Sequence, residues 1–232
     1  MARNATELFT DGWGAYEKVL KHNYMFHEEI YSDIKNYINR QKLNHSVSIL
    51  EAGCGDASQT IKLFKDFHIQ YYHGLDLSSF ALEIAKNNLK YLNGKINLKC
   101  IDILDGISEV SSHFDIIFTS FAIHHLSREK KQIFFNLTRE KLKNRGILIY
   151  IDVMKEKEEQ DRVSYINDYL DYANQHWNKL DEKEIKAVND HISNYDFPES
   201  VDGNITLAQN AGFKSYEKIS HHTWHQAIIF TR

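Results

Sequence analysis

The sequence has few of the residues that mark disulfide-rich or membrane-spanning proteins. Its 232 residues include two cysteines and one proline, and two cysteines are too few for a disulfide framework. No stretch of about 18 apolar residues occurs, so no transmembrane helix is predicted. The first residues, MARNATELFTDG, have no apolar core of the signal-peptide type. We therefore expect a cytoplasmic protein that does not interact with a membrane.

The charges are nearly balanced, with 28 basic and 32 acidic residues. No run of lysines or basic stripe suggests contact with a nucleic-acid backbone. The composition therefore argues against a DNA partner and disfavours RNA and protein substrates, which leaves a small molecule as the expected partner. A chain of this length is enough for one well-buried domain with a modest cap.

A glycine-containing stretch, ILEAGCGDA at residues 49–57, is the most informative part of the chain. It follows the pattern of a β-rich apolar strand, a turn at Gly53 and Gly55, and a helix with apolar spacing from Ile61 onward. Glycines at such a turn let a ligand approach the main chain closely. The stretch predicts a site for a nucleoside-type cofactor at the carboxyl ends of parallel strands.

Two acids and two further strands follow in order. Asp76 ends the apolar run YYHGLD, and Asp102 ends INLKCID. Residues 114–126 (FDIIFTSFAIHHL) and 145–153 (RGILIYIDV) have the pattern of a fourth and a fifth strand. Strands that alternate with helix-length segments predict a parallel sheet with right-handed crossovers.

Together these motifs resemble the class I S-adenosylmethionine-dependent methyltransferases, whose first motif is (D/E)-x-G-x-G. The resemblance implies an α/β fold with a Rossmann-like, mostly parallel seven-stranded sheet, helices on both faces and a C-terminal antiparallel hairpin. It implies S-adenosyl-L-methionine as cofactor and S-adenosyl-L-homocysteine as product. By the same resemblance Asp76 binds the ribose hydroxyls and Asp102 the adenine amino group. The cofactor-binding residues it implies are Glu51, Gly53, Cys54, Gly55, Asp76, Leu77, Asp102, Ile103 and Ser120.

We expect a single methyltransferase domain over residues 1–232. Its expected parts are an N-terminal helical cap (1–44), a cofactor-binding core (45–152), a helical lid (153–204) and a C-terminal β-hairpin (205–232). The cap has two helices over residues 12–41 with a break near Asn23. In the lid, Tyr165, Tyr169 and Tyr172 share one helix face. That face either packs on the fifth strand or lines an acceptor pocket.

Methyl transfer to a hydroxyl or a protonated amine needs a base, and histidine has a suitable pKa. The candidate general bases are His125, His191 and His222, although local packing and hydrogen bonding also explain a histidine at these places. His191, Asp196, His222 and His225 form a second polar set. The sequence has no C-x-x-C or H-E-x-x-H pattern, so no metal site is predicted.

The motifs also restrict the acceptor and leave two alternatives. The stretch after the fourth strand lacks the N-P-P-(Y/F) motif of adenine and glutamine N-methylating enzymes and the Pro-Cys of cytosine-C5 enzymes. An O or N atom of a small molecule is the expected acceptor. A non-catalytic module that binds S-adenosylmethionine is one alternative. An NAD-dependent oxidoreductase is the other, and Ser58 in place of the third fingerprint glycine speaks against it.

Overall fold

The structure is a computed structural model that describes residues 13–41 and 46–232. A seven-stranded sheet has the order β3-β2-β1-β4-β5-β7-β6. The first five strands pair in parallel, and β7 is antiparallel to both of its neighbours. The strands are β1 (Val47–Ala52), β2 (Ile69–Asp76), β3 (Lys95–Cys100), β4 (Phe114–Ser120), β5 (Leu142–Val153), β6 (Ser215–His222) and β7 (His225–Thr231). This arrangement confirms the predicted fold class.

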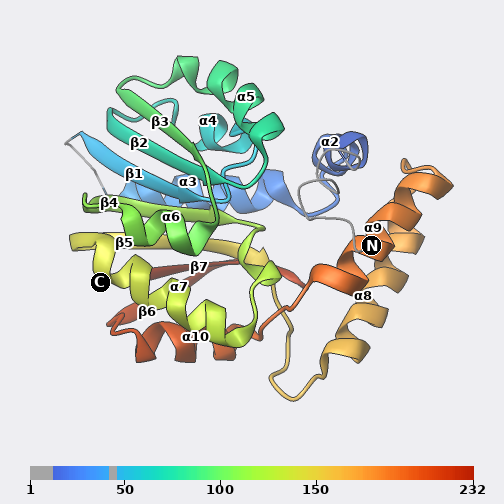
Figure 1. Cartoon of the computed structure of the whole chain (residues 1–232). Coiled ribbons are helices and arrows are strands. Elements are labelled where there is room, and N and C mark those ends of the chain that lie inside the picture. Colours follow the sequence, from blue (N-terminus) through green and yellow to red (C-terminus); the bar gives the residue numbers. More distant parts are fainter. Residues whose placement is uncertain (1–12, 42–45) are drawn as a thin grey trace.

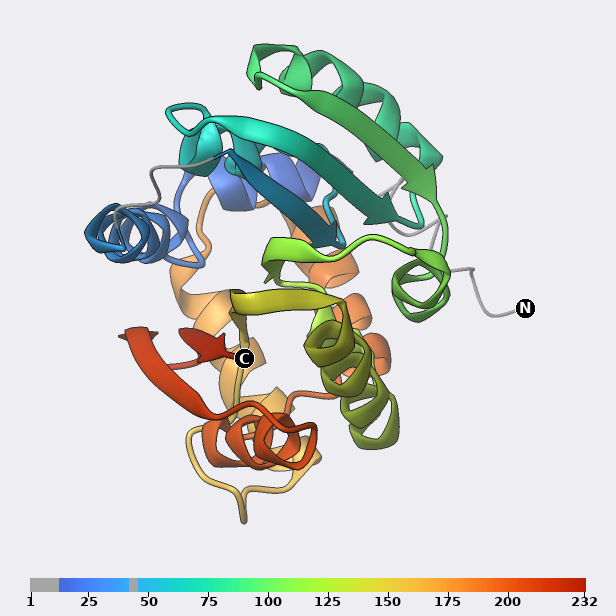
Figure 2. The ribbon, with the colours of Figure 1, turned by 90° about the vertical axis from the view of Figure 1, so that its left-hand side faces the viewer.

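Helices cover both faces of the sheet (Figures 1 and 2). One layer consists of α3, α4 and α5, and the other of α6, α7 and α10. Strand β1 is buried along its whole length, as expected for a central parallel strand with both faces covered. The helices are α2 (Trp13–Lys21), α3 (His27–Arg40), α4 (Ser58–Phe64), α5 (Ser79–Asn88), α6 (Ile103–Glu109), α7 (Arg128–Lys141), α8 (Arg162–His176), α9 (Glu182–Tyr195) and α10 (Val201–Asn210), with 3-10 turns η1 (Leu89–Tyr91) and η2 (Ile123–His125).

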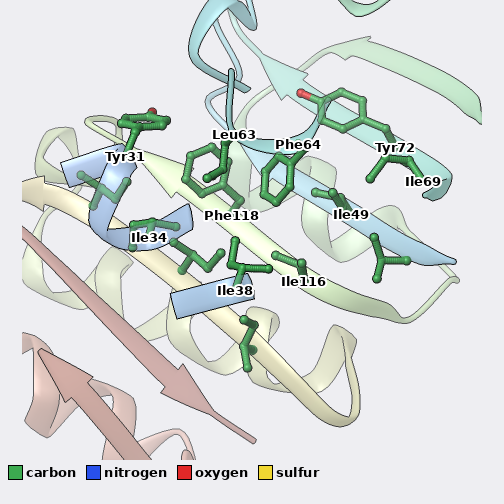
Figure 3. Packing of buried hydrophobic residues seen from close by; sticks show 14 of the residues in the cluster. Tyr31, Ile34, Ile38, Ile49, Leu63, Phe64, Ile69, Tyr72, Ile116 and Phe118 are labelled. Carbon is green, nitrogen blue, oxygen red and sulfur yellow. The ribbon is translucent and has the colours of Figure 1, made fainter. Parts of the chain in front are cut away.

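Helix α3 packs its apolar stripe on the sheet. Ile34 and Ile38 lie over Ile116 and Phe118 of β4, and Phe64 of α4 completes this part of the core (Figure 3). These isoleucines recur at the spacing of one helix face, which is the pattern of a helix that packs one side on a core. The α2–α3 pair also corresponds to the two expected helices of the cap, whose residues 1–12 and 42–44 lie outside the described part of the chain.

The break between α2 and α3 lies where it was predicted. Asn23 has a positive φ of 52°, and Phe26, directly before α3, has a φ of 56°. Asn23 also accepts a hydrogen bond from the Glu28 main-chain N–H. Asparagine tolerates the left-handed region better than other non-glycine residues, so the turn is encoded locally.

The segment after β5 contains α8 and α9, which lie beyond the carboxyl ends of the parallel strands, on the same side as α2 (Figure 1). Tyr165 and Tyr169 of α8 are buried, and Tyr172 is half-buried. The predicted boundary at residue 205 is wrong, because Val201–Asn210 is helix α10 and the hairpin starts at Ser215. None of the helices in the described ranges is long and apolar enough to cross a membrane.

Candidate active site

The turn between β1 and α4 is built from residues with positive φ. Gly53 has φ 75° and Gly55 has φ 51°. A Cβ on Gly53 would lie 2.5 Å from the Cβ of Ala122, whereas a Cβ on Gly55 would meet no atom within 4 Å. The two glycines are thus required for different reasons: Gly53 lets two chain segments meet, and Gly55 faces open space.

Asp76, at the end of β2, is held by main-chain amides. Its Oδ2 accepts a hydrogen bond from the Gly55 N–H and its Oδ1 from the Ser78 N–H, both at 2.8 Å. Burial raises the pKa of the carboxyl above its usual value, although these N–H groups act in the opposite direction. Each oxygen retains a second lone pair, so the carboxylate is oriented and still able to accept further hydrogen bonds.

Asp102 lies at the start of a helix and not inside a strand. Strand β3 ends at Cys100, and Asp102 is the N-cap of α6. Its Oδ1 accepts hydrogen bonds from the N–H groups of Leu104 (2.8 Å) and Asp105 (3.4 Å). The expectation that Asp102 ends the third strand is therefore corrected by two residues, and capping explains its fixed position.

Glu51 is a buried acid at the end of β1. It accepts hydrogen bonds from the Tyr72 hydroxyl (2.6 Å) and from the Thr60 hydroxyl (2.7 and 2.8 Å to its two oxygens). Burial raises its pKa from 4.5 to about 8, and these two hydrogen bonds only partly offset that effect. Glu51 is therefore predominantly protonated at neutral pH in the unliganded protein.

One cavity of about 190 Å³ joins these groups. All nine residues predicted to bind the cofactor line it: Glu51, Gly53, Cys54, Gly55, Asp76, Leu77, Asp102, Ile103 and Ser120. The same cavity is bounded by Met25, His27, Phe121, His125 and Leu126. The ends of β1, β2 and β3 thus supply a polar part of the lining, with three carboxylates, and these five residues supply a second part, with three apolar side chains and two imidazoles.

His27 lines this second part, and the sequence analysis did not identify it. Burial lowers the pKa of His27 to about 3, so its imidazole is neutral at neutral pH. Its Nδ1 has no hydrogen-bond partner among the described residues, and its ring packs edge-on against Phe121 with centroids 4.9 Å apart. The available signal was its position three residues before Ile30, on the buried face of α3.

Comparisons with known proteins agree with this fold. Residues 50–148 match the model of a family described as "Methyltransferase domain". The carboxy-S-adenosyl-L-methionine synthase of Campylobacter fetus is 26% identical over 82% of this chain and 80% of its own length. That of Nautilia profundicola is 26% identical over 88% of this chain and 92% of its own. The magnesium protoporphyrin IX methyltransferase of Synechocystis, solved with bound SAH, superposes with a TM-score of 0.65 over 98% of this chain and 97% of its own, at 12% identity.

Residues 50–148 carry a methyltransferase domain, and the fold is that of the class I S-adenosylmethionine-dependent methyltransferases. The predicted family, the enzyme class and the cofactor are thereby confirmed. The acceptor is not fixed by these likenesses, since the similar proteins differ in the reactions that their names state.

The three candidate bases occupy different surroundings in this methyltransferase. His125 lines the cavity, whereas His191 and His222 are not among its lining residues. The His191 ring packs edge-on against His125 with centroids 5.1 Å apart, and burial lowers its pKa to about 4. His222 stacks on Phe26 with centroids 4.6 Å apart. One of the three candidates, His125, therefore lies in the cavity wall.

The predicted second polar set is divided into two groups. His191 and Asp196 lie with His124 and His125 at one side of the methyltransferase cavity. His225 lies apart from them and shares a hydrogen bond of 2.8 Å between its Nε2 and the Tyr169 hydroxyl.

Asp196 is almost fully buried among the first group. Burial raises the pKa of Asp196, but His124, His125 and His191 lower it by more, so the pKa lies below its usual value. The carboxylate is therefore charged at neutral pH, in contrast to Glu51.

Proposed function

We propose that this methyltransferase transfers the methyl group of S-adenosylmethionine to an O or N atom of a small-molecule acceptor. The observation that supports this most strongly is that one cavity is lined by both sets of residues. The residues implied to bind the cofactor and the apolar and imidazole side chains of the second part share its walls. Methyl transfer is an in-line displacement that depends chiefly on placing the acceptor next to the sulfonium, and a shared cavity supplies that proximity.

We assign the cofactor to the polar part. Asp76 binds the ribose hydroxyls with the lone pairs that its contacts to Gly55 and Ser78 leave available. Asp102 binds the adenine amino group, because its capping bonds occupy Oδ1 and Oδ2 accepts no hydrogen bond from the described residues. Glu51, near the turn, supplies a carboxyl for the cationic end of the cofactor.

We assign the acceptor to the second part of the cavity. Met25, Phe121 and Leu126 offer apolar surface, and His27 and His125 offer polar groups that orient a ligand. His125 is the candidate base that lines the cavity, and we expect its ring to contact the acceptor. Helices α8 and α9 cover this end of the sheet (Figure 1), and with the balanced charge this favours a small acceptor over DNA, RNA or protein.

We place the reaction in the cytoplasm. Both cysteines are free, and Cys100 is exposed. An exposed free thiol is typical of a reducing compartment.

The cofactor assignment is tested with Asp76→Ala and the control Asp66→Ala. Asp66 is an exposed residue that pairs with Lys35. Loss of two hydrogen bonds to a charged group, each worth about 1.5–3 kcal/mol, should weaken binding of S-adenosylhomocysteine at least about tenfold. Calorimetry measures this directly, and unchanged binding by the Asp76 variant would refute the assignment.

The acceptor assignment is tested with S-adenosylmethionine labelled on its methyl group and a cytosolic extract separated by size. Label in the small-molecule fraction supports the proposal, and label in macromolecules contradicts it. Binding without any transfer would instead favour the non-catalytic module. With an acceptor identified, His125→Gln should lower turnover strongly, whereas His222→Gln should leave more than half of it.

A further inference from the structure

Three imidazole nitrogens converge on one carboxylate oxygen beside the cavity. The distances to Asp196 Oδ1 are 3.4 Å from His125 Nδ1, 3.7 Å from His124 Nε2 and 3.9 Å from His191 Nε2. The last two distances are too long for hydrogen bonds, and this oxygen accepts no hydrogen bond from the described residues. A buried carboxylate oxygen without a hydrogen bond is unfavourable unless a nearby positive charge, such as an imidazolium or a bound ion, compensates for it.

The spacing of these atoms fits ligands around a metal ion. In a tetrahedral site with metal–nitrogen and metal–oxygen distances of about 2.0–2.2 Å, neighbouring ligand atoms lie about 3.3–3.6 Å apart. The distances to Asp196 Oδ1 equal or slightly exceed this value. One ligand atom each from His124, His125 and Asp196 also lie within 4.8 Å of one another, so all three can reach a common ion with small side-chain movements.

The contacts behind His124 have the form found behind metal-bound histidines. Its Nδ1 lies 2.5 Å from Oδ1 of Asp152, a residue buried at the end of β5. A carboxylate can only accept, so Nδ1 carries the proton and, in the neutral ring, Nε2 presents its lone pair on the side of Asp196. A carboxylate that holds the second nitrogen of a ligating histidine fixes its tautomer and raises its basicity.

We propose that His124, His125 and Asp196 bind a divalent transition-metal ion of the zinc class, with His191 as the fourth ligand. Imidazole nitrogen with a carboxylate oxygen is a donor set that suits zinc. Four protein ligands close the coordination sphere, which is the arrangement of a structural site. Without metal, the Nδ1 of His125 donates to the Tyr195 carbonyl at 3.2 Å. Metal binding moves this proton to Nε2, so a metal-bound His125 contacts an acceptor as a hydrogen-bond donor and not as a base.

The ion would join two segments that are distant in sequence. His124 and His125 belong to η2 after β4, whereas His191 and Asp196 belong to the end of α9 and the residue after it. It would therefore fasten the helical segment α8–α9 to the core. This proposal does not depend on methyl transfer, because binding can be measured without an acceptor.

The test uses the full chain, freed of metal by chelation and titrated with Co(II). We expect one ion per chain and a visible absorption spectrum of tetrahedral type, which stoichiometric Zn(II) should abolish by displacing the cobalt. The melting temperature should rise on metal binding and fall again when chelator is added. Elemental analysis after gel filtration gives the stoichiometry. A chain that binds no Co(II) or Zn(II) would overturn the proposal and leave an imidazolium–carboxylate cluster in its place.

Variants distinguish this site from adventitious binding by other histidines. Asp196→Asn should abolish the tetrahedral spectrum, and Asp152→Asn, which removes the group behind His124, should weaken binding about 10–100-fold. The control is His221→Gln, since His221 is exposed and lies near Glu156 at the surface. Because Asp196→Asn can also impair folding, circular dichroism accompanies each titration, and His191→Gln provides a second loss of ligand. Equal losses in the His221 control would overturn the proposal.

Discussion

The cavity side assigned to the cofactor and the histidine cluster beside the cavity are positioned in different ways. On the assigned cofactor side, main-chain N–H groups hold the carboxylates, as Gly55 holds Asp76 and Leu104 holds Asp102. In the histidine cluster, side chains hold side chains across long stretches of sequence, as Asp152 holds His124. A site built on main-chain contacts depends on a few glycines and caps. A site built on side-chain contacts depends on the packing of whole elements.

The largest expected loss of stability comes from a substitution in the glycine turn, which belongs to the side held by main-chain contacts. Gly53→Ala places a methyl group 2.5 Å from the Cβ of Ala122 at a φ of 75°. The left-handed backbone costs about 1–2 kcal/mol and overpacking about 1–3 kcal/mol. We expect unfolding free energy to fall by about 2–5 kcal/mol in urea titrations, and cofactor binding to be lost.

Gly55→Ala is the matched control, because a Cβ there meets open space. It should lower stability only by the backbone term, about 1–2 kcal/mol. Because Gly55 lines the cavity, cofactor affinity should still decrease. Equal stability losses in the two variants would contradict this division of roles.

The second prediction concerns Glu51 and pH. Its folded-state pKa of about 8 lies above the ordinary value of 4.5, so between these values the native state holds a proton that the unfolded state has released. The stabilising contribution is complete below about pH 4.5 and is lost as pH rises toward 8, with a slope of at most about 1.4 kcal/mol per pH unit.

Glu51→Gln should remove this slope, since the amide cannot titrate and can still accept from Tyr72 or Thr60. Urea unfolding of both proteins at several pH values between about 5 and 8 measures it. Parallel stability profiles for the wild type and the variant would show that Glu51 does not carry the proton.

The smallest expected loss of stability comes from a contact between two side chains. Tyr169→Phe removes the hydroxyl that bonds His225 Nε2 inside the packed interface of α8 and β7. Burial lowers the pKa of His225 to about 3, so a neutral buried imidazole loses its partner, at about 1–3 kcal/mol. Thermal unfolding measures the loss, and cofactor binding should not change. Tyr172→Phe, on the same helix, should have less effect, and the reverse order would contradict this reading.

The sequence predicts the side held by main-chain contacts better than the histidine cluster held by side-chain contacts. Gly53, Gly55 and Asp76 lie in short motifs whose spacing is fixed by a local turn, and all of them line the cavity as expected. The mostly parallel seven-stranded sheet that the resemblance implies is also present. Local patterns predict the ends of strands less well. The third strand was expected to end at Asp102, but it ends two residues earlier, at Cys100.

The histidine cluster could not be predicted from spacing. His124 and Asp196 come together because the chain returns to η2 after α9. No pattern in the sequence between them indicates that these two side chains lie close together. The expectation of no metal site rested on local ligand patterns, which this arrangement does not use. His27 was missed for a similar reason, because its cavity position depends on how α3 crosses the sheet.

The buried Lys131 links the two chain segments that carry the histidine cluster. Its ammonium group donates hydrogen bonds to the carbonyls of Leu126 (2.6 Å) and Phe197 (2.5 Å), and these residues lie just after η2 and α9. Lys131 therefore holds the two chain segments together without a ligand. The entropy of arranging the imidazoles is lost in advance, so a molecule or ion that enters here binds to groups already in place.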